Sequence, residues 1–289
     1  MLGTLRSRLG EIARGRRSDV SRPAPGRATG ARAEPSGAAV APIGVEAFLP
    51  GDEWSGARGT VFVHECLRSS IERPQGAWGR LGTVAAIPGD RRAGAVELSD
   101  LGGVGLGRAL FLDLETCGLG SSPVFLAGTM HWNGSDFVLR QYFARHYGEE
   151  AALLAALAEQ TRGFEFLVTF NGKTFDVPFL TGRSLVHGVP LALPPRHLDL
   201  LHPARRRWRL SLPDCRLQTL ELYVCRRRRS GDVPGEEVPG LYHDFVRHGD
   251  PWRLVPVFHH NLLDVITMAE ILLALCAPPR GLGPDASED

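Results

Sequence analysis

The sequence predicts an α/β fold in which a mixed sheet is flanked by helices. Two apolar runs of strand length meet at Asn133-Gly134, a dipeptide typical of a tight turn between antiparallel strands. A third such run precedes them, and segments with helical and strand spacing alternate after them. Three antiparallel strands followed by helix, strand and helix are expected to form one sheet of mixed direction.

The expected strands are short runs of apolar, β-branched or aromatic residues, bounded by glycine or polar residues. They cover residues 60–64, 109–114, 124–132, 136–144 and 166–170. The expected helices repeat apolar residues at intervals of three and four positions. They cover residues 149–160, 175–187, 203–210, 216–224 and about 260–276, with a Pro/Gly loop at 231–240.

Composition predicts how the chain is divided. The first 40 residues hold eight Arg, three acidic residues and many Gly, Ala, Ser and Pro, a mixture that cannot bury enough apolar surface to fold. A short amphipathic helix for a partner is the alternative, because four apolar residues there have helical spacing: Leu2, Leu5, Leu9 and Ile12. The predicted division is a disordered tail at 1–45, a small lead-in of unknown role at 46–108, the main domain at 109–277 and a second disordered tail at 278–289.

Charge and cysteine content exclude several classes of protein. A net charge of +1 over 289 residues creates no global field for an anionic partner. Five cysteines, an odd number without a Cys-x-x-Cys pair, argue against a disulfide framework and a cysteine zinc site. No apolar run of bilayer length and no signal-peptide pattern is evident. We therefore expect a cytoplasmic protein with no membrane partner.

Asp113 and Glu115 lie two positions apart at the end of the apolar run 109–114. On a strand, this spacing places both carboxylates on one face, while Leu112 and Leu114 face the core on the other. Two carboxylates that leave water together repel each other unless a cation lies between them. The pair is therefore a candidate site for a divalent cation, although Asp-x-Glu arises by chance roughly once in a chain of this size.

The segment 171–176 follows a predicted strand and opens a predicted helix. The helix dipole favours the negative charge of Asp176 in the first helical turn. Asn171 and Lys173 are expected at the rim of the same strand end, within reach of a phosphate. Simple helix capping by Asp176 and a solvated Lys173 are the alternatives. Lys173 is the one lysine among 33 basic residues, a bias that a GC-rich genome explains.

His260 and Asp264 are four residues apart in the last predicted helix, so both lie on one helix face. An imidazole one turn from a metal-binding carboxylate suits a general base near neutral pH. Either His260 or its neighbour His259, taken alone, is as well explained as an ordinary surface histidine.

Together, the three motifs resemble the exonuclease motifs of the DEDD superfamily and, more narrowly, the bacterial YprB-like ribonuclease H-like proteins. Further segments support this resemblance: 111–119, 197–202, and Asp232-Val233-Pro234-Gly235 leading to Tyr242. The resemblance covers roughly residues 109–276. It implies a ribonuclease H-like fold and a metal-dependent 3′→5′ exonuclease that hydrolyses phosphodiester bonds in DNA or RNA. A structure-specific endonuclease on the same fold and an inactive nucleic-acid-binding module are the alternatives.

The resemblance also implies residue roles. Two divalent cations, Mg²⁺ or Mn²⁺, would lie about 3.5–4 Å apart in a two-metal mechanism. Their ligands would be four catalytic carboxylates: Asp113, Glu115, Asp176 and Asp264. His260 would be the general base, with His259 as the alternative, because related exonucleases with a histidine base place it five residues before the last Asp. Asn171 and Lys173 are expected to bind substrate.

Two arginine groups follow in the sequence: Arg205, Arg206, Arg207 and Arg209, then Arg226 to Arg229. They are interpreted either as a grip on a nucleic-acid backbone, with Trp208 available for base stacking, or as solvated faces. The nearby His197, Asp199 and His202 allow a separate metal cluster, but a structural role for Asp199 near the site is the favoured interpretation.

Overall fold

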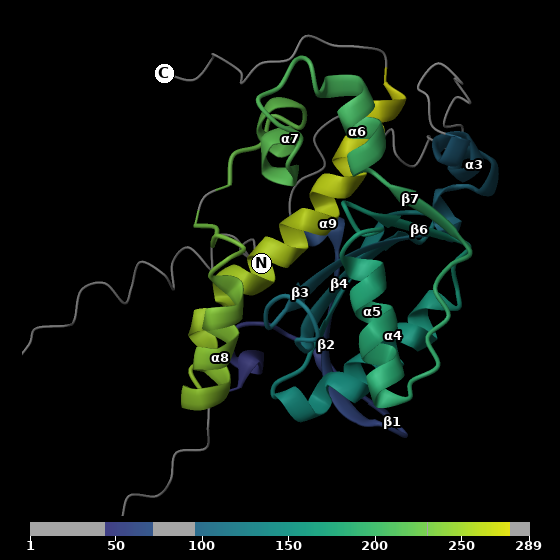
Figure 1. Cartoon of the computed structure of the whole chain (residues 1–289). Helices are drawn as coiled ribbons and strands as arrows, with labels where there is room; N and C mark the ends of the chain where they lie inside the picture. The colour runs from purple at the N-terminus through teal and green to yellow at the C-terminus, as the bar shows by residue number, and fades with distance from the viewer. Residues whose placement is uncertain (1–43, 72–95, 230, 278–289) are drawn as a thin grey trace, which may run out of the picture.

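A seven-stranded sheet forms the centre of the fold in a computed structural model that describes residues 44–71, 96–229 and 231–277 (Figure 1). The strand order is β1-β2-β5-β4-β3-β6-β7. In this order, the strands from β1 through β2, β5 and β4 to β3 are antiparallel to their neighbours. The strands β3, β6 and β7 are parallel to one another. The predicted mixed sheet is therefore confirmed. The strands are β1 (Asp52–Gly56), β2 (Gly59–Leu67), β3 (Ala109–Thr116), β4 (Val124–Trp132), β5 (Phe137–Phe143), β6 (Phe166–Thr169) and β7 (Arg196–Asp199).

Helices pack on both faces of this sheet, and the long helix α9 crosses it diagonally (Figure 1). One hydrophobic cluster joins α3, α6, α7 and most of α9 to one face of the sheet. A second includes α4 and α5, which cover the other face, and also reaches α8, whose aromatic residues pack on Phe143 together with Phe258 of α9. The helices are α2 (Arg68–Ile71), α3 (Val96–Val104), α4 (Glu150–Thr161), α5 (Asp176–His187), α6 (Leu201–Trp208), α7 (Leu217–Tyr223), α8 (Val238–His248) and α9 (Val255–Cys276). Short 3-10 turns are η1 (Val45–Ala47), η4 (Leu106–Arg108), η5 (Tyr147–Glu149) and η6 (Pro251–Leu254).

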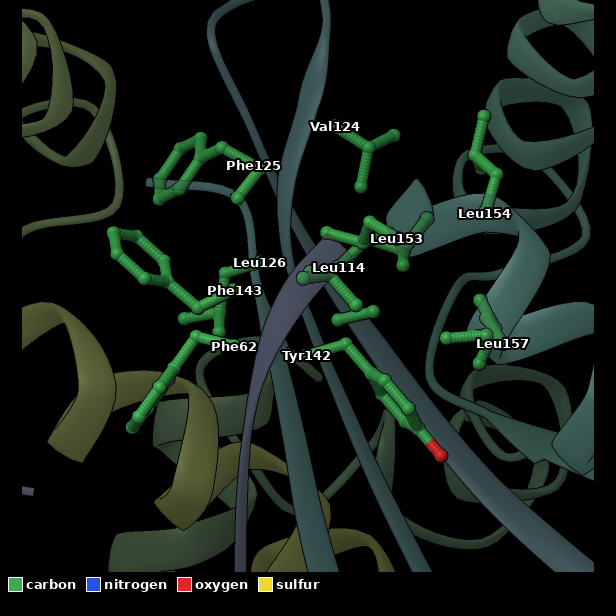
Figure 2. Close-up of a cluster of buried hydrophobic side chains, with 14 of the residues drawn as sticks. Phe62, Leu114, Val124, Phe125, Leu126, Tyr142, Phe143, Leu153, Leu154 and Leu157 are labelled. Carbon is green, nitrogen blue, oxygen red and sulfur yellow. The ribbon is translucent and has the colours of Figure 1, made fainter. Parts of the chain in front are cut away.

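Alternation along β3 determines where its acidic side chains point. Leu112 and Leu114 belong to the cluster that includes α4, whereas Phe111 belongs to the cluster under α9. Figure 2 shows the cluster that includes α4: the leucines of α4 lie beside Leu114 and Tyr142, whereas Phe62, Phe125 and Phe143 lie on the opposite side of the strands. The prediction that Leu112 and Leu114 face the core is confirmed, and Asp113 consequently faces α9.

Several elements that are short or carry proline were missing from the sequence prediction. These are β1, α2, α3, β7 and α8, the last of which begins at Val238 inside the expected loop at 231–240. The prediction also began the last helix near residue 260, five residues after the observed start of α9 at Val255. Both α8 and α9 carry proline in their first turn, where the missing N–H has no helical partner to lose. Proline there marks a helix start and does not break the helix.

With the turn before it, α9 spans Pro251–Cys276 and is long and apolar enough to cross a membrane by length and composition alone. No apolar run of bilayer length was expected from the sequence, and this expectation is wrong. Its most apolar window is 72% buried inside the fold, as in the central helix of a core.

Residues before the first long strand of the main domain also join the sheet. β2 pairs with β5, and β1 is the edge strand beyond it, so the segment 52–67 extends the antiparallel half. Of the predicted N-terminal tail, residues 1–43, with the amphipathic alternative, lie outside the described residues, as does the predicted tail at 278–289. The expectation is wrong for Val45, which is buried and begins η1.

Candidate metal centre

Segments that are far apart in the sequence bring four carboxylates together. Asp113 and Glu115 leave β3 beyond the stretch that pairs with β6. Asp176 is the first residue of α5, and Asp264 lies on α9, which packs against β3. The charges of Asp264, Glu115 and Asp176 all act on Asp113. The structure therefore gathers the four predicted metal ligands into one acidic cluster.

Burial makes this cluster reluctant to ionise. It raises the pKa of Asp113 well above its ordinary value, and the neighbouring carboxylates add to the rise. Burial raises the pKa of Glu115 to about 8, although the charge of His260 opposes the shift. Burial also raises the pKa of Asp176 to about 7 against hydrogen bonds from backbone amides, including that of Leu114. The cluster has more buried acid than the protein's own cations neutralise.

Carboxylate oxygens are the donors that Mg²⁺ and Mn²⁺ prefer, so the residues present fit the implied cations in kind. Across the ranges that the structure describes, however, no group of three or more His, Cys, Asp or Glu side chains is arranged to hold a metal ion. The alternative metal cluster at His197, Asp199 and His202 is therefore not formed either. In the acidic cluster, one carboxylate is already occupied, because the guanidinium group of Arg229 binds Asp264. A cation held by these carboxylates would therefore require side-chain movement, in which Asp264 would release Arg229.

Asn261 connects the acidic cluster to the centre of the sheet. Its Nδ2 donates to Asp113 Oδ2 at 2.9 Å and lies 3.3 Å from the Asp113 backbone oxygen. Its Oδ1 accepts from Gln141 Nε2 at 3.0 Å. Gly128 lies between Asp113 and Gln141 in the strand register, and a Cβ there would be 2.1 Å from Asn261 Oδ1. A glycine on β4 thus makes room for the buried amide that orients Asp113.

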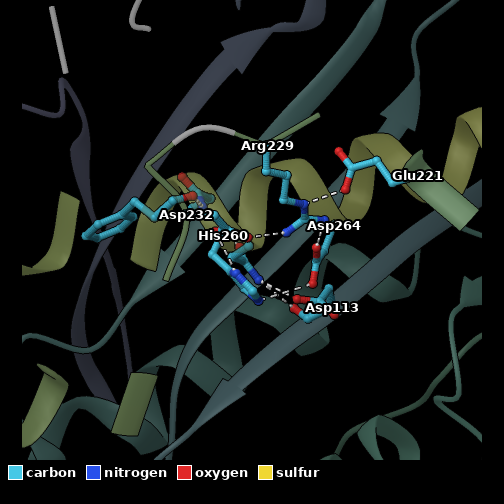
Figure 3. A network of polar contacts seen from close by, with 9 residues as sticks. Asp113, Glu221, Arg229, Asp232, His260 and Asp264 are labelled. Carbon is cyan, nitrogen blue, oxygen red and sulfur yellow. Dashed lines mark hydrogen bonds and ion pairs between the residues drawn. The ribbon is translucent and has the colours of Figure 1, made fainter. Parts of the chain in front are cut away.

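His260 faces the acidic cluster and is held by a second carboxylate (Figure 3). Its Nδ1 lies 2.8 Å from Asp232 Oδ1, and its Nε2 lies 3.6 Å from Asp264 Oδ2. Burial opposes the charged imidazole, but the hydrogen bond with Asp232 and the charges of Asp264 and Glu115 outweigh burial and raise the pKa of His260 to about 9. The imidazolium therefore acts as one of the counter-charges of the cluster.

Arg229, with its side chain 8% exposed, is the second cation of this network (Figure 3). It binds Glu221 and Asp264, and its Nη1 lies 3.1 Å from Asp232 Oδ2. Burial opposes its charge, yet the carboxylates raise its pKa above the ordinary value. Arg227 likewise pairs with Glu270. These two arginines are bound within the fold, so they are not free to grip a nucleic acid.

Asp199 organises the turn that leads to Asp176. Its carboxylate accepts hydrogen bonds from the backbone N–H groups of Asn171 at 2.7 Å, Lys173 at 3.1 Å and Leu201 at 3.1 Å. Asn171 adopts a left-handed conformation with φ 64°. The Lys173 Nζ lies 3.6 Å from Glu97 Oε1. The predicted substrate-binding pair thus lies beside the cluster, with the Lys173 ammonium at an acidic neighbour.

Sequence reasoning missed several supporting residues. Asp232 belongs to a motif that carried the family resemblance but had no assigned role, and its signal was the Asp-Val-Pro-Gly run. Asn261 stands between His260 and Asp264 in the third motif, yet nothing in the sequence indicates its contact with β3. Trp208 was offered for base stacking, but it is 5% exposed and belongs to the core under α9, so that interpretation is wrong.

A mixed sheet with carboxylates gathered at the end of β3, the first strand of the main domain, is typical of a ribonuclease H-like protein. A family model described as the RNase_H superfamily matches residues 110–276, more than half of the chain, and the chain belongs to this superfamily. It is 34% identical over 168 residues to the uncharacterized protein YprB of Bacillus subtilis (strain 168). This confirms the predicted resemblance to YprB-like proteins. The match covers 56% of this chain and only 40% of YprB.

Among solved structures, the fold is similar to part of the family B DNA polymerase from the hyperthermophilic archaeon Pyrobaculum calidifontis. The TM-score is 0.46 and the sequence identity 19%. The similarity covers 56% of this chain and 23% of the polymerase.

Proposed function

We propose that this chain is a metal-dependent 3′→5′ exonuclease that hydrolyses phosphodiester bonds of DNA or RNA. The observation that supports this proposal is the gathering of Asp113, Glu115, Asp176 and Asp264, with His260, on a ribonuclease H-like sheet. These four carboxylates would hold two Mg²⁺ or Mn²⁺ ions. When bound, such ions supply the activation of water and the neutralisation of the departing oxygen that this hydrolysis needs.

The side chain of His260 is oriented for proton transfer in this proposal. When its Nδ1–H donates to Asp232, the neutral ring presents Nε2 as an acceptor toward the acidic cluster. Negative charge in that cluster helps to hold the pKa of His260 at about 9. Neutralising this charge lowers the pKa toward the neutral range, where Nε2 can accept a proton. Asp232 is therefore a positioning residue, and His260 is the proposed general base.

His259 is the alternative base from the sequence pattern. The contacts of His260 support it as the base, since both of its ring nitrogens lie within 3.6 Å of acidic oxygens. Asn171 and Lys173 remain the proposed substrate contacts at the rim of the cluster, with Lys173 exchanging Glu97 for a phosphate.

Digestion of end-labelled substrates tests the proposal. Linear DNA and RNA labelled at the 3′ or the 5′ end, and circular forms of each, are incubated with and without Mn²⁺. We expect release of 3′-terminal nucleotides that requires Mn²⁺ and is lost in Asp113→Asn. Asp52→Asn is the matched control, because Asp52 is exposed on the edge strand β1.

Direct measurement of Mn²⁺ binding by calorimetry separates a metal site from activity alone. Wild type and Asp52→Asn should bind Mn²⁺, and Asp113→Asn should bind it more weakly. Cleavage of circular substrates would replace the exonuclease by an endonuclease on the same fold. Nucleic-acid binding without cleavage in Mg²⁺ or Mn²⁺ would show an inactive binding module.

A further inference from the structure

One face of α6 carries a cluster of basic side chains that the candidate metal centre does not use. They stand at positions i, i+3, i+4 and i+7 of the helical sequence and are all exposed: His202, Arg205, Arg206 and Arg209. Together they line an open pocket of about 350 Å³, called here the α6 basic pocket. Three guanidinium groups around one hollow are suited to bind an anion with several oxygens, such as a phosphate.

The neighbouring Arg207 shows that this cluster is more than an arginine-rich composition. Arg207 points elsewhere and donates to the backbone oxygens of Leu275 at 2.9 Å and Ala277 at 2.8 Å, at the end of α9. In the part of the chain that the structure describes, Arg205 and Arg209 have no carboxylate within 4.0 Å. The fold therefore assigns one arginine of the run to packing and leaves the others directed at solvent around the pocket.

The α6 basic pocket lies at the same edge of the sheet as the acidic cluster. Because β3, β6 and β7 are parallel, their carboxyl ends meet at one edge, and α6 begins directly after β7. Asp199 ties the first turn of α6 to the turn before Asp176. Between the two sites, the charges of both Lys173 and Arg206 act on Glu97 of α3. Lys173 at the rim of the cluster and Arg206 at the pocket therefore both lie near the same carboxylate, that of Glu97.

We propose that the α6 basic pocket binds backbone phosphates of a nucleic-acid strand whose end lies in the acidic cluster. This rests on the proposed nuclease function and adds the direction in which the strand leaves the site: past Lys173 and across α6. A nucleic acid fits better than an acidic peptide, because the pocket shares its sheet edge with groups that suit phosphodiester chemistry. Contacts to backbone phosphates carry no sequence preference, so the pocket would serve any sequence.

Binding measurements with matched variants test this proposal. Full-length wild type, Arg205→Gln/Arg209→Gln and the control Arg162→Gln/Arg247→Gln are titrated with a fluorescent single strand of about 20 nucleotides. The two double variants have the same net charge. Arg162 and Arg247 are exposed at the ends of α4 and α8, away from α6. Titration at several salt concentrations gives the number of phosphates contacted.

We expect the affinity of the α6 variant to fall at least about tenfold. Its salt slope should fall by about 1.4, since each single-strand phosphate contact contributes about 0.7. The control should stay close to wild type. Equal losses in the two double variants would overturn the pocket, and so would polyglutamate binding that matches the nucleic acid in affinity. Cleavage by wild type is scored separately: binding through α6 without any Mn²⁺-dependent cleavage would remove the nuclease and keep the pocket.

Discussion

Replacing Gly128 with alanine tests how the fold orients Asp113. Gly128 lies on β4 directly beside Asp113, under the fully buried Asn261 of α9. An added Cβ would lie 2.1 Å from Asn261 Oδ1 and 2.7 Å from its Cγ, so the amide must move. Movement weakens the hydrogen bonds of Asn261 to Asp113 and from Gln141.

The expected cost comes from two sources. Overpacking a filled interior costs about 1–3 kcal/mol, and a disturbed buried hydrogen bond costs about 1–3 kcal/mol. Because relaxation of α9 shares these costs, we expect Gly128→Ala to lower the free energy of unfolding by about 2–4 kcal/mol. The same change should weaken Mn²⁺ binding, since Asp113 loses its amide donor.

Urea unfolding of four proteins measures this effect: wild type, both single variants and Gly128→Ala/Asn261→Ala. Removing the amide removes the clash, so the double variant should be no less stable than Asn261→Ala alone, with a coupling of about 2–4 kcal/mol that equals the cost of Gly128→Ala in the wild type. Gly182→Ala is the control, because Gly182 is exposed in α5 and a Cβ there meets no atom within 4 Å. It should stabilise by about 0.5–1 kcal/mol. Additive losses, or a cost of Gly128→Ala below about 0.5 kcal/mol, would refute the packing argument.

Three further predictions follow from the site. The folded protein has a pKa of about 8 for Glu115, about 7 for Asp176 and about 9 for His260, all above the values in the unfolded chain. Without metal, the folded chain therefore binds more protons than the unfolded chain, and its stability should fall as the pH rises through this range. Mn²⁺ competes with these protons, so calorimetry should show a larger rise in Tm on adding Mn²⁺ near pH 8 than near pH 6; an equal rise would contradict this. Asp232→Asn should lower the pKa of His260 in an NMR titration, because it removes the main group that favours the imidazolium, and an unchanged value would show that Asp232 does not hold the ring. Asp199→Ala leaves three backbone donors without their acceptor and should cost more than about 2 kcal/mol in urea unfolding, whereas a cost below about 1 kcal/mol would mean that water replaces the carboxylate.

The sequence alone determined the order of β3 to β6 and of the helices α4 to α7 and α9 in the main domain, but neither β7 nor α8. Period-two alternation placed Leu112 and Leu114 on the core face, and Asn133-Gly134 indicated the β4–β5 hairpin. The motifs at Asp113, Asp176 and Asp264 also identified the acidic residues that the fold brings together. These predictions succeeded because each depends on local spacing, and local spacing is written directly in the chain.

Only the tertiary structure decided which side chains meet across the sheet. The contacts of Asn261 with β3, of Asp232 with His260 and of Arg229 with Asp264 join residues 28 to 148 positions apart. Such contacts depend on how α9 and the segment before α8 pack on the sheet, which no local pattern encodes. The same packing gives the arginines their separate roles, with the Arg229 side chain enclosed in the network and Arg209 exposed at the end of α6, because burial decides whether a charge must find a partner inside the fold.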